Sequence, residues 1–410
     1  MNLADAHQKQ QKTQFDLLIV GGGMVGASLA IALKNSALNI GLIEARSLAN
    51  NSQPSYDDRG IALSYGSQTI FQSMGLWPDI APCATAIKHI HISDRGRFGV
   101  TRLSAEKQQV PALGQVLTAR DLGQHLNRHL QQMTQLSLFC PAQVSSLSKL
   151  DDRIEVSLDN GQKLSAKLLV AADGRDSTIR RLVGLDAREQ QYQQIAITAN
   201  ISTDQAHNGR AFERFTDSGP MALLPMSDNR SSLIWTVSEG QEKALLDAPD
   251  TVFLDQLQQR FGYRAGRFIQ VGQRSSHPLT LMQADMPVQP RCVLIGNAAH
   301  SLHPIAGQGF NLGLRDVAVL AELLTDAGED CGHAAILHNY QQWRQKDQDQ
   351  LVRATHHLVQ LFSNNISLLG HLRGAGLAAL DTLPPLKNWL AQRSMGLAQT
   401  QPRLGRGIGL

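Results

Sequence analysis

The sequence has no apolar run long enough to cross a bilayer and no clustered cysteines. A membrane-spanning helix needs about 20 consecutive apolar residues, and the polar leader MNLADAHQKQQKTQ also lacks the apolar region of a secretory signal. Cys83, Cys140, Cys292 and Cys331 show no CxxC spacing, so neither a disulfide framework nor a zinc site is indicated. We therefore expect a cytoplasmic protein with reduced thiols.

The chain also lacks a strong excess of either charge. Its net charge is +3 and its basic residues form no long run, so no nucleic-acid partner is indicated. With 410 residues, of which 42% are hydrophobic and 18% charged, the chain has the composition of a globular protein. It exceeds the roughly 250–300 residues at which a single hydrophobic core stops growing. We expect two domains in one compact body.

A glycine-rich motif follows the leader, in FDLLIVGGGMVGASLAIALKNSALNIGLIEAR. An apolar run ends in Gly21-x-Gly23-x-x-Gly26, a helical stretch follows, and a second apolar run ends at Glu44. This order is the dinucleotide fingerprint: Gly21 permits the turn, Gly23 lets a pyrophosphate approach, and Gly26 lets the helix pack on the strand. Because Glu44 accepts from ribose hydroxyls and repels a 2′-phosphate, the pattern predicts NAD or FAD at this site rather than NADP.

Two later stretches each place a polar turn after an apolar run. LLVAADGRDSTIRRLVG carries Asp173 in an Asp-Gly turn and Ser177 as the predicted cap of a helix over 178–183. CVLIGNAAHSLHPIAGQGFNLGLRD runs from a strand at 292–295 through a loop at 296–308 into a helix from about Gly309. The first turn of that helix offers unpaired N–H groups that can stabilise negative charge on a ligand.

With these three motifs in this order, the chain from Phe15 to about Gly396 resembles the FAD-dependent aromatic hydroxylases of the p-hydroxybenzoate hydroxylase fold, and among them the polyprenyl-methoxyphenol hydroxylases of ubiquinone biosynthesis. The resemblance implies an α/β fold: a Rossmann-like FAD-binding domain, an inserted antiparallel β-sheet substrate domain and a C-terminal helical segment. We expect the FAD-binding domain at 15–75, 100–183 and 286–350, the substrate domain at 76–99 and 184–285, and the helical segment at 351–410. Alternating apolar stretches such as QIAITANIS and SSLIWTVS suit the inserted sheet.

The same resemblance implies which residues contact the cofactor. Besides Gly21, Gly23, Gly26 and Glu44, the expected FAD contacts are Arg59, Gln115, Arg120, Asp173, Asn297, Gly307, Gln308, Gly309 and Asn311. Asn297 departs from most relatives, which carry Asp there, but its amide oxygen can still accept a hydrogen bond from a ribitol hydroxyl. His303 and Pro304 are expected near the reacting edge of the flavin, with His303 a candidate for contacting substrate.

The stretch GPMALLPM at Gly219–Met226 is expected to line the substrate side, through Met221, Leu223 and Pro225, although ordinary sheet core must account for half of its residues. A metal site at His300 and His303 is not expected, because no Asp, Glu or Cys stands at metal-ligand spacing. We expect His300 to be satisfied by backbone groups instead.

The resemblance implies class A flavin monooxygenation: NAD(P)H reduces FAD, O₂ forms a flavin C4a-hydroperoxide, and one oxygen atom passes to the ring of a polyprenylated methoxyphenol. Two other functions stay open, an FAD-dependent reductase or oxidase of the same fold and a catalytically idle flavoprotein scaffold. The basic C-terminal segment has two interpretations. It makes a peripheral contact with an anionic membrane or with other ubiquinone-biosynthesis proteins, or it is a helix packed on the body.

Overall fold

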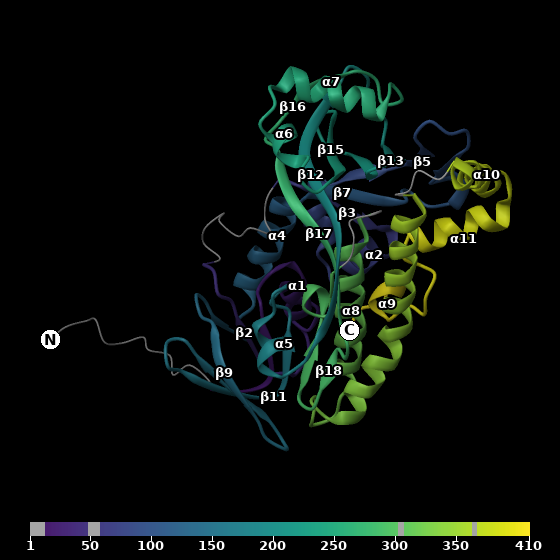
Figure 1. Ribbon diagram of the computed structural model, residues 1–410. Helices are drawn as coiled ribbons and strands as arrows, with labels where there is room; N and C mark the ends of the chain where they lie inside the picture. Colours follow the sequence, from purple (N-terminus) through teal and green to yellow (C-terminus); the bar gives the residue numbers. More distant parts are fainter. Residues whose placement is uncertain (1–12, 48–57, 302–306, 363–366) are drawn as a thin grey trace.

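Figure 1 shows the protein as a computed structural model that describes residues 13–47, 58–301, 307–362 and 367–410. Within these residues the strands form sheets of eight, nine and three strands. Each sheet contains strands that are distant in the sequence, so the segments that build the three sheets alternate along the chain. This mixed α/β architecture with C-terminal helices confirms the predicted fold class.

The eight-stranded sheet has a parallel core in the order β19-β11-β1-β2-β8, with β18 antiparallel to β19 at one edge and with the antiparallel strands β10 and β9 following from β11. Its strands are β1 (Gln14–Val20), β2 (Ile40–Ile43), β8 (Leu136–Phe139), β9 (Val144–Lys149), β10 (Ile154–Leu158), β11 (Lys163–Ala171), β18 (Val288–Gln289) and β19 (Cys292–Leu294). β1 pairs in parallel with β2 and β11, and β11 pairs in parallel with β19. The carboxyl ends of these strands therefore meet at one edge, where open α/β sheets bind ligands.

Both faces of the parallel part of this sheet are buried, which explains why strands such as β1, β2 and β19 are apolar at consecutive positions. Leu17 and Ile19 belong to one core cluster together with Leu320 of α8, whereas Leu18 and Val20 belong to a second cluster on the opposite face. Each fully buried Leu or Ile contributes about 1.5–3 kcal/mol by leaving water. The helices around this sheet are α1 (Met24–Ala32), α4 (Ala119–Gln132), α5 (Thr178–Leu182) and α8 (Gln308–Thr325).

The nine-stranded sheet runs in the order β20-β17-β12-β15-β14-β13-β5-β6, with β16 beside β12. Its strands are β5 (His89–Asp94), β6 (Val100–Ser104), β12 (Ala187–Thr203), β13 (Arg210–Thr216), β14 (Gly219–Pro225), β15 (Arg230–Ser238), β16 (Phe268–Val271), β17 (Ser275–Ala284) and β20 (His300–Ser301). α6 (Glu242–Leu246) and α7 (Asp250–Phe261) accompany it. β5 and β6 form an antiparallel pair, so the boundary expected at residue 100 falls inside a hairpin, and we move the proposed boundary beyond Ser104.

A small sheet and the C-terminal helices complete the body. The sheet contains β3 (Gly60–Ser64), β4 (Thr85–Ile87) and β7 (Gly114–Thr118), and short helices follow at α2 (Tyr65–Ser73) and α3 (Trp77–Ile80). The remaining helices are α9 (Ala334–Phe362), α10 (Ser367–Thr382) and α11 (Pro384–Ser394). The domain boundary expected at residue 350 falls inside α9, which is one continuous helix. In Figure 1, α10 and α11 lie beside β5, and none of the described helices is long and apolar enough to cross a membrane.

Candidate active site

The three glycines of the first motif have different surroundings. Gly21 has φ +104°, and a Cβ atom there would lie 2.4 Å from the Ala172 carbonyl oxygen. A Cβ at Gly26 would lie 1.9 Å from the Gly21 carbonyl oxygen, whereas a Cβ at Gly23 would meet nothing within 4 Å. Gly21 and Gly26 are therefore needed for the packing of the chain itself. Gly23 faces open space at the start of α1, and no side chain caps that helix, so its first turn can receive an anion.

Glu44 follows β2 and holds the glycine turn from the other side. The buried Glu44 carboxylate accepts from the Gly22 amide at 2.6 Å through Oε2 and from the Arg46 amide at 2.7 Å through Oε1. Each carboxylate oxygen has a second lone pair, so Glu44 can also accept from a ribose hydroxyl. One carboxylate thus fixes the turn and is available to a nucleotide.

A cavity of about 490 Å³ lies at the carboxyl edge of the parallel sheet. Its lining unites the three motifs, with Gly23 from the first, Gly174 from the second, and Asn297, Gly307 and Gly309 from the third. The exposed Asn297 faces this space, and Gly307 begins α8 in the left-handed conformation, with φ +59° and no side-chain cap. We call this space the flavin cavity, because five of the expected FAD contacts line it: Gly23, Arg59, Asn297, Gly307 and Gly309.

Asp173 has a carboxylate oxygen that is available to a ligand. Its Oδ2 accepts from the Ile179 amide at 3.1 Å, whereas its Oδ1 is buried without a hydrogen-bond partner among the described residues. Burial raises the pKa of Asp173, against the hydrogen bonds from Ser177 and the backbone. Ser177 caps α5 as predicted and accepts from the Arg180 amide at 2.9 Å.

Asn311 is fully engaged within the protein. Its Oδ1 accepts from the Ser64 amide at 2.8 Å, and its Nδ2 donates to the carbonyl oxygens of Ala62 and Gly307, each at 2.8 Å. Asn311 therefore ties β3 to the start of α8, and we assign it a positioning role beside the flavin cavity. Gln308, the first residue of α8, does not line the flavin cavity but a second cavity, which is apolar and lies beside it.

Arg59, Gln115 and Arg120 have different surroundings. Arg59 lines the flavin cavity, as expected of a cofactor contact. Arg59 and Arg120 both line an adjacent polar cavity of about 400 Å³, where Arg120 pairs with Asp58 at 3.3 Å. Gln115 donates to Gln68 at 3.2 Å and lines neither of these cavities. His303 and Pro304 lie outside the described residues.

Sequence reasoning missed a buried charge network below the third motif. The fully buried Asp316 accepts through Oδ2 from the Gly296 amide at 3.0 Å and from His300 Nε2 at 2.6 Å, and through Oδ1 from Arg344 Nε at 2.8 Å and Gln348 Nε2 at 3.0 Å. Burial alone would raise the pKa of Asp316, but His300 and Arg344 outweigh it and hold the pKa below its usual range. The expectation that backbone groups satisfy His300 is wrong, because its partner is this carboxylate. The charged pair Arg315-Asp316 inside an apolar helix was the available signal.

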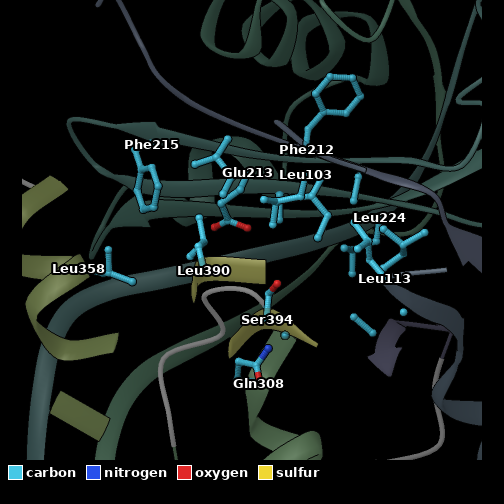
Figure 2. Close-up of a pocket in the computed structure, with 18 of the residues that line it drawn as sticks. Leu103, Leu113, Phe212, Glu213, Phe215, Leu224, Gln308, Leu358, Leu390 and Ser394 are labelled. Carbon is cyan, nitrogen blue, oxygen red and sulfur yellow. The ribbon is translucent and has the colours of Figure 1, made fainter. Parts of the chain in front are cut away.

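A second, apolar cavity of about 580 Å³ adjoins the flavin cavity. The two cavities share Ala62, Leu224, Ile234 and Gly307, so they meet at these residues. Figure 2 shows the Glu213 carboxylate directed into this space among leucine and phenylalanine side chains.

The structure corrects the predicted substrate face of β14. Ala222 and Leu224 line the apolar cavity, whereas the buried Met221 and Leu223 belong to the core cluster on the other side of the sheet, with Phe253 and Leu257 of α7. Pro225 has the same parity as Met221 and Leu223 and does not line the cavity. Apolar residues stand at both parities of GPMALLPM because both faces are covered, so hydrophobicity alone could not identify the cavity face.

Comparisons with known proteins bear on this site. The sequence model of the family described as "FAD binding domain" matches residues 14–355. The ubiquinone hydroxylase UbiL of Rhodospirillum rubrum is 37% identical over 96% of this chain and 93% of its own. The 3-demethoxyubiquinol 3-hydroxylase of Escherichia coli is 30% identical over 93% of this chain and 98% of its own.

Solved structures share the fold at lower identity. The p-nitrophenol 4-monooxygenase PnpA of Pseudomonas putida has a TM-score of 0.77 at 17% identity and covers 95% of this chain and 100% of its own. A variant of Klebsiella pneumoniae HpxO complexed with FAD has a TM-score of 0.74 at 16% identity, over 95% and 99%. At this identity the likeness concerns the fold alone.

Proposed function

The chain belongs to the FAD-binding monooxygenase family, and on that premise we propose that it hydroxylates the ring of a polyprenylated methoxyphenol in ubiquinone biosynthesis, with NAD(P)H and O₂ as co-substrates. Relatives named as ubiquinone hydroxylases support the pathway. The observation that supports a prenylated substrate is the apolar cavity, which joins the flavin cavity at Ala62, Leu224, Ile234 and Gly307.

The residues present fit FAD on three counts. The open space at Gly23 admits a pyrophosphate at the uncapped start of α1. Glu44 has lone pairs for the ribose of the adenosine half, and the unpartnered Oδ1 of Asp173 provides a further acceptor. Asn297 and the first turn of α8 then lie along the flavin cavity, to bind the ribityl chain and the ring.

Reduced FAD, when bound, supplies the activated oxygen for hydroxylation. The contribution of the chain is to place the ring, to exclude water and to stabilise negative charge on the flavin. The uncapped start of α8 at Gly307 directs its dipole towards the flavin cavity, which favours an anion there. The apolar wall beyond the junction keeps water from the reacting edge.

The apolar cavity suits a long hydrocarbon chain attached to a ring. A cavity of about 580 Å³ is within the usual range for a small-molecule site, roughly 300–1,000 Å³. Each buried methylene contributes about 0.8 kcal/mol, so even a short prenyl chain dominates the binding energy over the polar groups of the ring.

Glu213 is the residue that we assign to the phenol hydroxyl. In the sheet, Glu213 on β13 is paired with Ala222 on β14, and Ala222 is paired with Ile234 on β15, which lines both cavities. Two strand spacings of about 4.8 Å separate Glu213 from Ile234, so the backbones of these two residues lie about 10 Å apart. A phenol ring fits between them, and its O–H donates to the carboxylate, which orients the ring and makes it richer in electrons.

The substrate is tested by deleting the gene and identifying the accumulated quinone precursor by mass spectrometry. Accumulation of a prenylated methoxyphenol supports the proposal, and a precursor with other ring substituents would assign the protein to a different hydroxylation step. Unchanged ubiquinone without any such intermediate would contradict the proposal.

A further inference from the structure

The apolar cavity has an exposed rim at the end remote from the flavin. Leu358 and Leu361 of α9 and Leu372 of α10 line the cavity and are nevertheless 36%, 42% and 60% exposed. Figure 2 shows Leu358 at the opposite end of the cavity from Leu224, which belongs to the junction with the flavin cavity. These three leucines form the mouth of the cavity.

α11 continues the apolar surface beyond the mouth. Leu390 lines the cavity, and Leu386 lies four residues before it on the same face of the helix, while Leu383 directly precedes the helix as its N-cap. Leu383 and Leu386 are 49% and 43% exposed, and the neighbouring Trp389 is 54% exposed. Such a concentration of exposed large apolar side chains on adjoining helices marks an interaction surface.

This part of the chain carries an excess of positive charge. Residues 351–410 contain six Lys and Arg and a single acid, Asp381, whereas the whole chain has a net charge of only +3. Three of the six cations have carboxylate partners within the protein: Lys387 pairs with Asp381 at 2.7 Å, Arg373 with the buried Asp94 at 3.0 Å, and Arg403 with Asp326 at 2.7 Å. The Arg393 guanidinium lies over the Trp389 ring, 4.5 Å from its centre, which places a cation and an interfacial aromatic side by side.

We infer that this rim, formed by Leu358, Leu361, Leu372 and the exposed face of α11, docks on an anionic lipid surface. The inference rests on the proposed function, because a prenylated substrate resides in a bilayer. Leucines enter the boundary of the acyl chains, Trp389 occupies the headgroup level, and the neighbouring Arg393 pairs with lipid phosphates. The prenyl chain then passes from the bilayer into the cavity without crossing water.

Vesicle flotation of the full-length protein with bound FAD tests the docking. We expect binding to phosphatidylcholine vesicles that contain about one third phosphatidylglycerol, weaker binding to phosphatidylcholine alone, and a decrease as salt rises. Removing one cation, as in Arg393→Gln, should weaken binding about fivefold. The double variant Leu361→Glu/Leu372→Glu should weaken it at least roughly tenfold, and its flavin content should equal that of the wild type.

Leu150→Glu is the matched control, since Leu150 is 43% exposed and lies after β9 in the other large sheet. If this control lost vesicle binding as strongly as the double variant, or if both bound like the wild type, the inference would be overturned. Absence of binding to either vesicle would also overturn it and would favour a lipid-carrying protein as the partner.

A second measurement does not depend on the folding of the double variant. Brominated phosphatidylcholine should quench tryptophan fluorescence of the wild type, and Trp389→Phe should remove most of that quenching; equal quenching in both proteins would contradict the inference. The proposed function is tested separately by hydroxylation of a prenylated phenol in detergent micelles. Loss of that activity with vesicle binding intact would refute the function and not the docking, and the reverse result would refute the docking alone.

Discussion

Replacing Gly23 by valine separates cofactor binding from folding. Gly23 has φ −64° and ψ 179°, which any residue adopts, and a Cβ there meets nothing within 4 Å. The cost to folding is therefore that of a poorer helix cap, about 1 kcal/mol. The branched side chain would occupy the space that we assign to the pyrophosphate. Losing two charge-assisted hydrogen bonds of about 1.5–3 kcal/mol each weakens FAD binding at least roughly 100-fold.

The assay compares flavin content after purification and the rise in melting temperature on adding FAD. FAD at 100 times its dissociation constant stabilises the wild type by about 2.7 kcal/mol, and the variant should show almost none of this stabilisation. Gly328→Val is the control, since a Cβ at Gly328 also meets nothing within 4 Å and the residue is remote from the flavin cavity. Gly26→Val should instead unfold the motif, because its Cβ would overlap the Gly21 carbonyl. A Gly23→Val protein that purified with one FAD per chain would refute the assignment.

Three further substitutions test the rest of the site. Asn297→Asp should hold FAD as well as the wild type or better, and Asn297→Leu should lose about 1–3 kcal/mol of binding, measured by flavin fluorescence titration; equal affinities would remove Asn297 from the site. Glu213→Gln should leave FAD binding unchanged and lower the hydroxylated product formed per NAD(P)H about tenfold or more, so unchanged coupling would exclude Glu213 as the phenol partner. Asp316→Asn should cost about 3–5 kcal/mol of stability in thermal denaturation, because Arg344 and His300 stay buried. Since folding lowers the pKa of Asp316, this difference should be full above about pH 4 and should shrink as the pH falls below it, and a constant difference would contradict the network.

The glycine motif could be interpreted from the sequence because its spacing dictates geometry. Gly21 and Gly26 stand where any Cβ would overlap backbone, and Glu44 follows directly on a strand whose four residues are all buried. Ser177 could likewise be predicted as a helix cap, because the capping hydrogen bond joins it to the nearby Arg180 amide. These features depend on contacts within one supersecondary unit, which short-range patterns encode.

Features that depend on long-range packing could not be predicted in the same way. The sequence could not show which face of β14 Met221 and Leu223 occupy, because both faces are covered by apolar partners that come from elsewhere in the chain. Arg344 and Asp316 stand 28 positions apart, and no spacing rule links an arginine on α9 to a carboxylate on α8. In the sequence, Glu213 looks like an ordinary polar residue on a strand. Only the pairing of three strands in the sheet aligns it with Ile234.

The central claim is that the flavin cavity and the apolar cavity act together to place an oxygen atom on a prenylated phenol. Its direct test supplies purified protein, FAD and NAD(P)H with a prenylated methoxyphenol under isotope-labelled O₂, and determines the product by mass spectrometry. We expect one labelled oxygen atom on the aromatic ring and NAD(P)H oxidation that the phenol stimulates. NAD(P)H oxidation that yields hydrogen peroxide with no labelled product, or a product whose oxygen comes from water, would contradict it.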